Sequence, residues 1–124
     1  MSSDYKLITK IEESLKEKGY TKIDRGLIVF GGKNNGTVDL KASKEDKTES
    51  IIIEIKSNPI HILDLSHFLM IKKNIESRKE LQERLIFYLL TNERPINSAL
   101  ITIAKGRGIE IINIDEFISK KRFS

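Results

Sequence analysis

The segment Ser50-Ile-Ile-Ile-Glu54-Ile-Lys56-Ser57 has the composition of a buried β-strand. Isoleucine is β-branched and favours the pleated, closely packed environment of a strand. Successive side chains of a strand point to opposite faces, so Glu54 and Lys56 are expected on one face together with Ile52. A carboxylate and an ammonium therefore project side by side from a strand that is otherwise apolar.

A second polar position lies in the segment from Thr37 to Ala42, which alternates polar with apolar residues and predicts another strand. Asp39 shares its face of this strand with the other polar side chains. The charged stretch from Ser43 to Glu49 is typical of a solvated hairpin loop. If the two strands pair through that loop, Asp39 lies beside Glu54 on one face of the sheet.

Two neighbouring carboxylates and a lysine can support the chemistry of a metal ion. Carboxylates that lie close together repel each other unless a cation sits between them. Magnesium takes one or two carboxylates and completes its shell with waters and phosphate oxygens, and Lys56 could orient a water or stabilise charge developing on phosphorus. The alternative is a surface ion pair between Glu54 and Lys56, worth well under ~1 kcal/mol. The surrounding isoleucines and the matching face of Asp39 favour the metal site.

Hydrophobic periodicity along the chain predicts the element order α-β-β-β-α-β-α-β-α. An antiparallel meander that leads into two crossover connections indicates an α/β fold with a central mixed β-sheet and helices on both faces. A length of 124 residues suits one domain. Besides the strands above, the expected elements are a helix from about Asp4 to Lys18 with Ser3 as its cap, a strand Leu27–Phe30, a turn-rich link Gly31–Gly36, a helix from Asn58 and Pro59 to about Lys79, a strand Leu85–Leu90, a helix from Pro95 to Gly106, a strand Ile109–Ile114 and a terminal helix from Asp115.

The composition excludes several classes of site. The chain has no cysteine, which rules out disulfides, zinc–thiolate sites and thiol nucleophiles, and its two histidines, His61 and His67, are too few for a histidine-rich metal site. Any metal would be a hard ion held by oxygen atoms. The net charge of +4 permits a polyanionic partner without requiring one. The apolar runs are too short to span a membrane, and charged residues interrupt the N-terminus where a signal peptide would be apolar, so we expect a cytoplasmic protein.

The two polar strands resemble a known nuclease motif. Gly36-Thr-Val-Asp39-Leu and Ile51-Ile-Ile-Glu54-Ile-Lys56-Ser resemble the motif of the PD-(D/E)XK, or restriction-endonuclease-like, superfamily, and the element order resembles its core over nearly the whole chain. The short length and the Glu-Ile-Lys-Ser run look most like archaeal Holliday-junction resolvases. The run Val38-Asp-Leu is also similar to small excision-controlling factors of cyanobacterial elements. One departure is Val38, which stands where the motif usually has proline.

The resemblance implies roles for residues of both strands and of the first helix. It makes Asp39, Glu54 and the main chain of Ile55 metal ligands, and Lys56 the catalytic lysine. Many superfamily members also carry a glutamate near the metal on the first helix, and Glu12 is the matching position here, on the flank of that helix's apolar stripe. The alternative for Glu12 is the solvated flank of an amphipathic helix.

Lys72 is a candidate outside the motif. It falls in the middle of the apolar stripe of the next helix, which is formed by Leu65, Phe68, Leu69 and Ile75. Its ammonium reaches either water beyond the stripe or the polar site. Because the helix directly follows the strand that carries Glu54 and Lys56, we predict that Lys72 binds the scissile phosphate or orients Glu54.

These observations lead to one leading hypothesis and two alternatives. The leading hypothesis is a deoxyribonuclease that uses Mg²⁺ or Mn²⁺ to hydrolyse DNA phosphodiesters, with branched DNA as its expected substrate, and that acts as a homodimer on two strands. The alternatives are a catalytically inactive module that binds nucleic acid or protein, and a restriction-type or element-excision nuclease. The intact set of Asp39, Glu54 and Lys56 favours an active enzyme.

Overall fold

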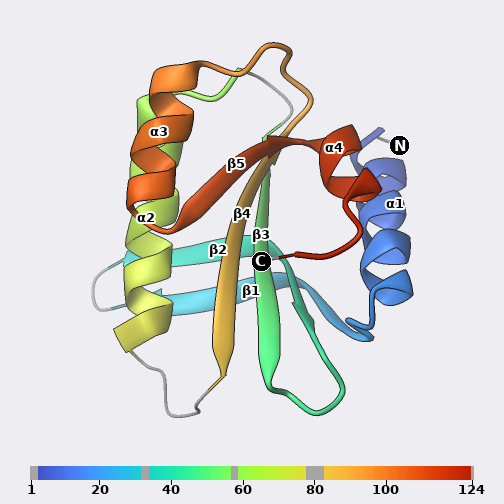
Figure 1. The fold of residues 1–124 in the computed structure, drawn as a ribbon. Helices are drawn as coiled ribbons and strands as arrows, with labels where there is room; N and C mark the ends of the chain where they lie inside the picture. Colours follow the sequence, from blue (N-terminus) through green and yellow to red (C-terminus); the bar gives the residue numbers. More distant parts are fainter. Residues whose placement is uncertain (1–2, 32–33, 57–58, 78–82, 124) are drawn as a thin grey trace.

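The computed structural model describes residues 3–31, 34–56, 59–77 and 83–123. They form an α/β fold in which a five-stranded mixed sheet lies between helices on both sides (Figure 1). The predicted fold class and order of elements are confirmed. The elements are α1 (Ser3–Glu17), β1 (Lys22–Gly31), β2 (Asn34–Ser43), β3 (Glu49–Lys56), α2 (Ile62–Ser77), β4 (Arg84–Thr91), α3 (Ser98–Gly106), β5 (Ile109–Asn113) and α4 (Ile114–Ser119).

The strands stand in the order β1-β2-β3-β4-β5. The first three form an antiparallel meander, whereas β4 runs parallel to β3 and β5 runs parallel to β4. Parallel neighbours need crossover connections, which α2 and α3 provide on the same face of the sheet (Figure 1). The middle strand β3 has a hydrogen-bonded neighbour on each side and helices on each face, which explains why its centre is nearly all isoleucine.

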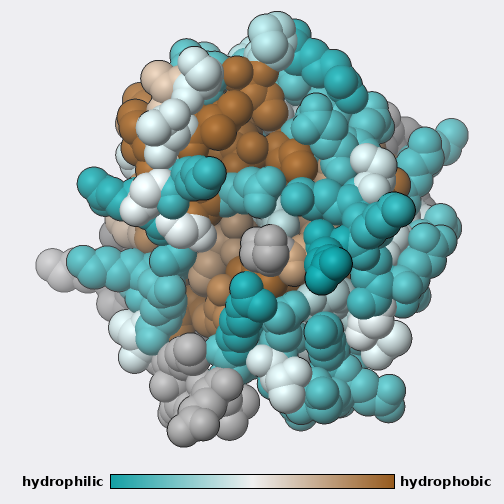
Figure 2. Space-filling model, in the orientation of Figure 1, coloured by the Kyte–Doolittle hydropathy of each residue, from teal (hydrophilic) through white to brown (hydrophobic). Residues whose placement is uncertain are grey.

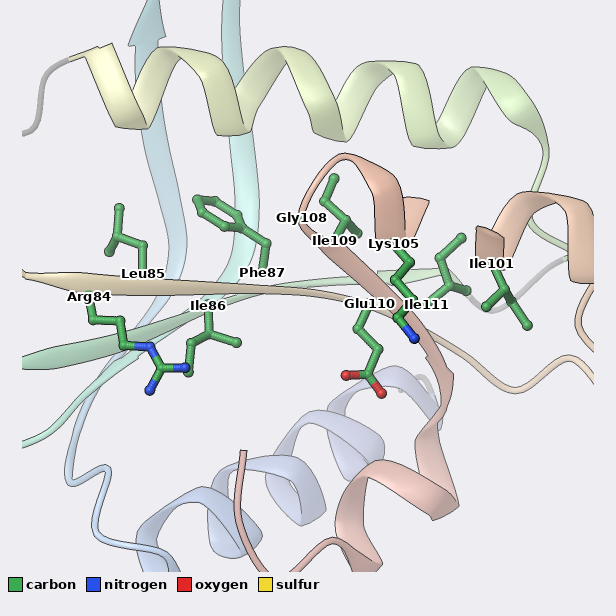
Figure 3. Close-up of a pocket in the computed structure, with 10 residues that line it drawn as sticks. All are labelled: Arg84, Leu85, Ile86, Phe87, Ile101, Lys105, Gly108, Ile109, Glu110 and Ile111. Atoms are coloured by element: carbon green, nitrogen blue, oxygen red, sulfur yellow. The ribbon is translucent and has the colours of Figure 1, made fainter. Parts of the chain in front are cut away.

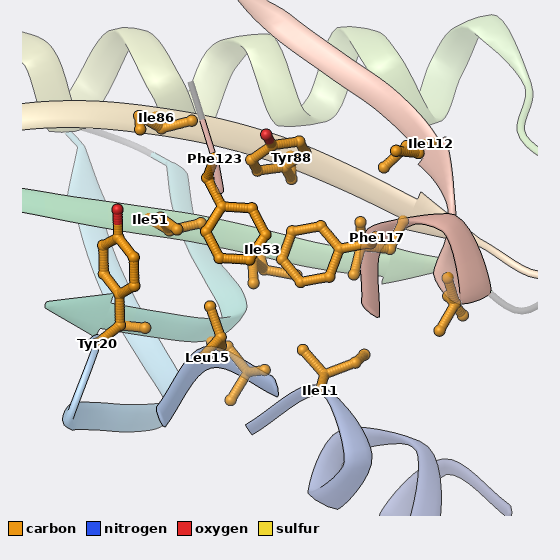
Figure 4. Close-up of a cluster of buried hydrophobic side chains, with 14 residues drawn as sticks. Ile11, Leu15, Tyr20, Ile51, Ile53, Ile86, Tyr88, Ile112, Phe117 and Phe123 are labelled. Carbon is orange, nitrogen blue, oxygen red and sulfur yellow. The ribbon is translucent and has the colours of Figure 1, made fainter. Parts of the chain in front are cut away.

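Two hydrophobic clusters fill the two faces of the sheet. Alternation divides the isoleucines of β3 between them: Ile51 and Ile53 pack toward α1 and α4, and Ile52 packs toward α2 and α3. Figure 4 shows the first cluster, where the ring centres of Tyr88 and Phe117 are 5.0 Å apart. On the molecular surface, hydrophilic residues cover α1, while hydrophobic residues show between α3 and β5 (Figure 2).

The alternation of side chains breaks at one position of β2. Val38 packs in the cluster under α2, whereas Leu40, two residues later, packs in the cluster under α1. A regular strand would place both residues on one face. The break therefore falls at Asp39. In the pairing of β1 with β2, Asp39 and Gly26, which has a φ of +61°, lie between the pairs Arg25–Leu40 and Leu27–Val38. A local irregularity of this kind moves side chains from one face of a strand to the other, here between Val38 and Leu40.

The helix α2 begins later than the predicted start at Asn58 and Pro59, and that prediction was wrong. The first helical residue is Ile62. The carboxylate of Asp64 accepts the backbone N–H of His61 at 2.9 Å, so the cap of the helix is at His61. Asn58, with which the predicted helix began, and its predicted end at Lys79 lie outside the described residues.

Side-chain caps also correct the starts of α3 and α4. The predicted start at Pro95 was wrong, because the side chain of Asn97 accepts N–H groups of the first turn and α3 begins at Ser98. In the same way Asn113 caps α4, which begins at Ile114, one residue before its predicted start. In the described part of the chain, no helix is long and apolar enough to cross a membrane.

The hairpin of β1 and β2 is longer than the sequence predicted. The two strands pair with each other along their whole length. As a result β1 starts ahead of the predicted Leu27, at Lys22, and most of the link predicted for Gly31–Gly36 is strand. Local turn residues indicated a loop there, but pairing with a partner strand overrides that preference.

Candidate active site

Asp39 and Glu54 meet where the pairing of β2 with β3 stops. The ladder ends with Leu40 paired to Ile53, and the next position along it sets Asp39 opposite Glu54. There the side chains provide the hydrogen bonds: Asp39 Oδ2 accepts the N–H of Ile55 at 2.7 Å. The Glu54 carboxyl in turn shares a hydrogen bond with the Asp39 carboxylate. The structure thus brings together Asp39 and Glu54, the two acids that the sequence predicted to lie side by side.

This contact changes the protonation of Glu54. The residue is only 7% exposed. Burial, the hydrogen bond to Asp39 and the charge of Asp39 raise the pKa of Glu54 from 4.5 to about 8, while the charge of Lys56 lowers it. Near neutral pH, and without a cation, Glu54 therefore holds a proton that it shares with Asp39. The pair then carries one negative charge instead of two.

The donor atoms of this pair suit a hard divalent cation. A cation could replace the proton that the two carboxylates share, and magnesium needs only one or two carboxylates because it keeps several waters. Among the residues that the structure describes, no three acidic or histidine side chains lie close enough together to hold a metal ion. A cation at the pair would therefore need ligands other than side chains. The main chain of Ile55 could supply a metal ligand only through its carbonyl oxygen, because its N–H is a donor and donates to Asp39.

Lys56 lies at the end of β3 with its ammonium near an acid that the sequence analysis did not single out. Its Nζ is 3.8 Å from Oδ1 of Asp64, in the first turn of α2. The charge of Lys56 also lowers the pKa of Glu54, which stands two residues before it on the same face of β3. The sequence shows that Asp64 lies near the start of the helix that follows the strand of Glu54. Its contact with Lys56 depends on how α2 packs.

Buried polar residues at the same edge of the sheet support the connections around the site. Thr91 and Asn113, the last residues of β4 and β5, are nearly fully buried and stand side by side in register. Glu93 accepts the N–H of Ile60 at 2.8 Å, and Asn113 donates to the carbonyl oxygen of Glu93. These bonds tie the segment after Lys56 to the ends of the neighbouring strands.

Glu12 does not join the carboxylate pair in this structure. Its carboxylate binds the guanidinium of Arg25 through two hydrogen bonds, one of them 2.7 Å long. The hydrogen bond to Arg25 lowers the pKa of Glu12, against a smaller opposing effect of burial. Arg25 pairs with Leu40, whose side chain packs toward α1. Glu12 therefore lies on the α1 face, whereas Lys56 and Asp64 lie on the α2 face.

Lys72 also has partners away from the pair. Its ammonium lies 2.9 Å from the carboxylate of Glu76, one turn further along α2, and 5.2 Å from the ring centre of Phe87. The end of its side chain packs against Gly108, where an added Cβ would come within 3.2 Å of Lys72 Cε. The side chain is 16% exposed. These contacts place the charge over β4, beside the start of the edge strand β5.

The substitution Lys72→Met separates a structural role from a role in the site, because it keeps the apolar stem and removes the charge. If the chain cleaves DNA as the sequence predicts, the contacts above lead us to expect a single-turnover rate within about twofold of wild type. They also predict a change in unfolding free energy below about 1 kcal/mol. A rate lower by about tenfold or more, equivalent to ~1.4 kcal/mol of transition-state stabilisation, would instead support the role predicted from the sequence.

A cavity of about 580 Å³ lies apart from the carboxylate pair, where β4 extends past the start of β5. Figure 3 shows apolar side chains of β4, α3 and β5 along it, with Arg84, Lys105 and Glu110 as its charged residues. Neither acid of the pair lines this cavity. The pair thus lies at the open end of the ladder and away from this cavity.

Comparisons with known proteins identify the fold. No family model matches the chain, and no curated protein does. Solved structures with a similar fold include a repair endonuclease from Pyrococcus abyssi, with a TM-score of 0.58 and 15% identity, covering 90% of this chain and 46% of that one. Another is the small subunit of the heterodimeric restriction endonuclease R.BspD6I, with a TM-score of 0.57 and 14% identity, covering 91% of this chain and 64% of that one. A third is EndoMS in a complex with dsDNA, with a TM-score of 0.54 and 14% identity, covering 90% and 44%.

Two other solved structures, with TM-scores of 0.64 and 0.66 at 16% and 17% identity, have names that state no activity. The chain spans less than two thirds of each of these five chains, from 30% to 64% of their lengths. At such identities the likeness shows the fold alone. The fold is similar to that of restriction endonucleases.

Proposed function

We propose that this chain is a divalent-metal-dependent endonuclease of the PD-(D/E)XK kind, which hydrolyses DNA phosphodiesters. The observation that carries the proposal is the reciprocal contact of Asp39 with Glu54, beside the charge of Lys56. Burying two acids that must share a proton costs free energy. A bound cation would offset this cost, and the oxygen atoms of the pair suit a hard cation. The similarity of the fold to endonucleases supports the same reading.

The residues of the pair would hold the cation, and Lys56 would act on the substrate. A bound Mg²⁺ or Mn²⁺ supplies Lewis-acid activation of a water and neutralises phosphate charge. Asp39 keeps one carboxylate oxygen on the N–H of Ile55, so its other oxygen would be the one to hold the cation. Glu54 would release its proton when the cation enters. The ammonium of Lys56 would stabilise the negative charge that develops on the phosphoryl oxygens.

The finer parts of the proposal concern substrate and assembly. We propose branched or otherwise structured DNA as the substrate, because the run Glu54-Ile-Lys56-Ser resembles that of archaeal Holliday-junction resolvases. A homodimer would place one site on each of two strands. The net charge of +4 suits a polyanion, and one of the similar structures is a complex with dsDNA.

A panel of DNA substrates tests the function. Duplex, flap, single-stranded and four-way-junction DNA would be incubated with the full chain in Mg²⁺, in Mn²⁺ and in excess chelator. We expect cleavage only with metal, fastest on the junction, with paired cuts on opposite strands. If the protein bound these DNA substrates but cleaved none of them, the result would support the inactive binding module instead. Cleavage undiminished in chelator would contradict the proposed function.

A further inference from the structure

Both carboxylate oxygens of Asp64 have a partner, and the two partners belong to different parts of the molecule. Oδ2 accepts the N–H of His61 at 2.9 Å and so caps the first turn of α2. Oδ1 lies 3.8 Å from Nζ of Lys56, and the Asp64 side chain is 26% exposed. The first bond fixes the carboxylate to the start of the helix. The second oxygen is thereby held toward the last residue of β3.

The ammonium of Lys56 lies close to two sets of anions. One set is Asp64, and the other is the pair of Asp39 and Glu54, because Lys56 follows Glu54 on the same face of β3 and its charge acts on that carboxyl. A lysine side chain is long and flexible, so its ammonium can move between neighbouring anions. If the ammonium of Lys56 moved onto Asp39 and Glu54, it would occupy the position that a bound cation would take.

The length of the contact between Lys56 and Asp64 is informative. At 3.8 Å it is an ion pair but is longer than a hydrogen bond. The carboxylate therefore attracts the ammonium without fixing the direction of its three N–H donors. Those donors remain available for a phosphate oxygen.

We propose that Asp64 is a positioning residue that keeps the ammonium of Lys56 beside the carboxylate pair but out of the place of the metal ion. The inference rests on the proposed function, since it concerns the same cation and the same lysine. When the charge of Asp64 is removed, Lys56 moves toward Asp39 and Glu54, and a metal ion must then displace it.

The substitution Asp64→Asn tests this, because the amide oxygen can still accept the N–H of His61 while the charge is lost. We expect the dissociation constant for Mg²⁺, measured by titration calorimetry on the full chain, to rise about three- to fivefold, the size of a partly exposed ion pair. Lys56→Met should bind Mg²⁺ more tightly than wild type. In the Lys56→Met background, Asp64→Asn should change the constant by less than about 1.5-fold, as the double-mutant cycle requires when one residue acts through the other.

Glu93→Gln is the matched control. Like Asp64→Asn, it neutralises a carboxylate that accepts a backbone N–H between β3 and α2, in this case the N–H of Ile60. The acid in contact with Lys56, however, is Asp64. Its effect on Mg²⁺ binding should be clearly smaller than that of Asp64→Asn. In cleavage, Asp64→Asn should need about three- to fivefold more Mg²⁺ and, at saturating Mg²⁺, reach the wild-type rate within about twofold.

Two results would overturn the inference alone: Mg²⁺ binding by Asp64→Asn equal to that of wild type, or the same loss in the Lys56→Met background as in the wild type. In both cases metal-dependent cleavage by the wild type would leave the proposed function intact. A wild-type protein that binds no Mg²⁺ would overturn both together.

Discussion

Glu54→Gln and Asp39→Asn should each lower the rate of DNA cleavage by roughly 1000-fold or more, equivalent to ~4 kcal/mol of transition-state stabilisation. Each change keeps the size of the side chain and an oxygen that can accept a hydrogen bond, so in Asp39→Asn the N–H of Ile55 keeps its acceptor. What is lost is one of the two negative charges that hold the cation. Single-turnover cleavage of the best substrate at saturating Mg²⁺ measures the effect.

Glu110→Gln provides the control for this experiment. Glu110 is an acid of β5 that lies 3.8 Å from Lys120 and lines the cavity away from the pair. Its neutralisation should leave the rate within about twofold of wild type. Circular dichroism and thermal unfolding of all variants would check that the fold is kept. Cleavage by Glu54→Gln or Asp39→Asn at the wild-type rate would remove the pair from the mechanism.

The raised pKa of Glu54 predicts that the metal-free protein loses stability between pH 5 and pH 8. Below pH 4.5 the carboxyl is protonated in both the folded and the unfolded chain. Between 4.5 and about 8 it ionises in the unfolded chain but keeps its proton in the folded one, so the unfolded state gains stability as the pH rises. Above about 8 the carboxyl is ionised in both states and the loss is complete. In chelator, we expect the melting temperature of the wild type to fall over this window by about 4 °C or more relative to Glu54→Gln.

Metal ions and a second variant provide the checks. Asp39→Asn removes the charge that opposes the ionisation of Glu54, so in chelator at pH 8 it should melt at a higher temperature than the wild type. Mg²⁺ should raise the melting temperature of the wild type, more strongly at pH 8 than at pH 5, because at pH 8 no proton has to be displaced. It should have little effect on either variant. Parallel pH curves for the wild type and Glu54→Gln would show that the two acids do not interact as the structure has them.

Much of the fold follows from the sequence because the signals are local. The isoleucines around Glu54 predict a buried strand, and the strict alternation of a strand places Glu54 and Lys56 on one face. The order of helices and strands follows in the same way from periodicity, and the structure confirms it. The resemblance to restriction-endonuclease-like proteins also depends on these local patterns, and structures of similar fold include such enzymes.

The contacts of the site depend on packing between elements that are distant in the chain. Asp39 reaches Glu54 at the point where the alternation of β2 breaks and the ladder to β3 ends, and no local pattern predicts that break. The partners of the long charged side chains are equally non-local or depend on helix starts. Arg25 binds Glu12 across two elements, and Asp64 faces Lys56 because α2 begins at Ile62 and not at Pro59. A flexible side chain pairs with whichever charge the packed elements bring within its reach. The sequence by itself therefore determines the face of each residue along a regular strand such as β3, and the tertiary structure decides where the alternation breaks and which partner each charged side chain has.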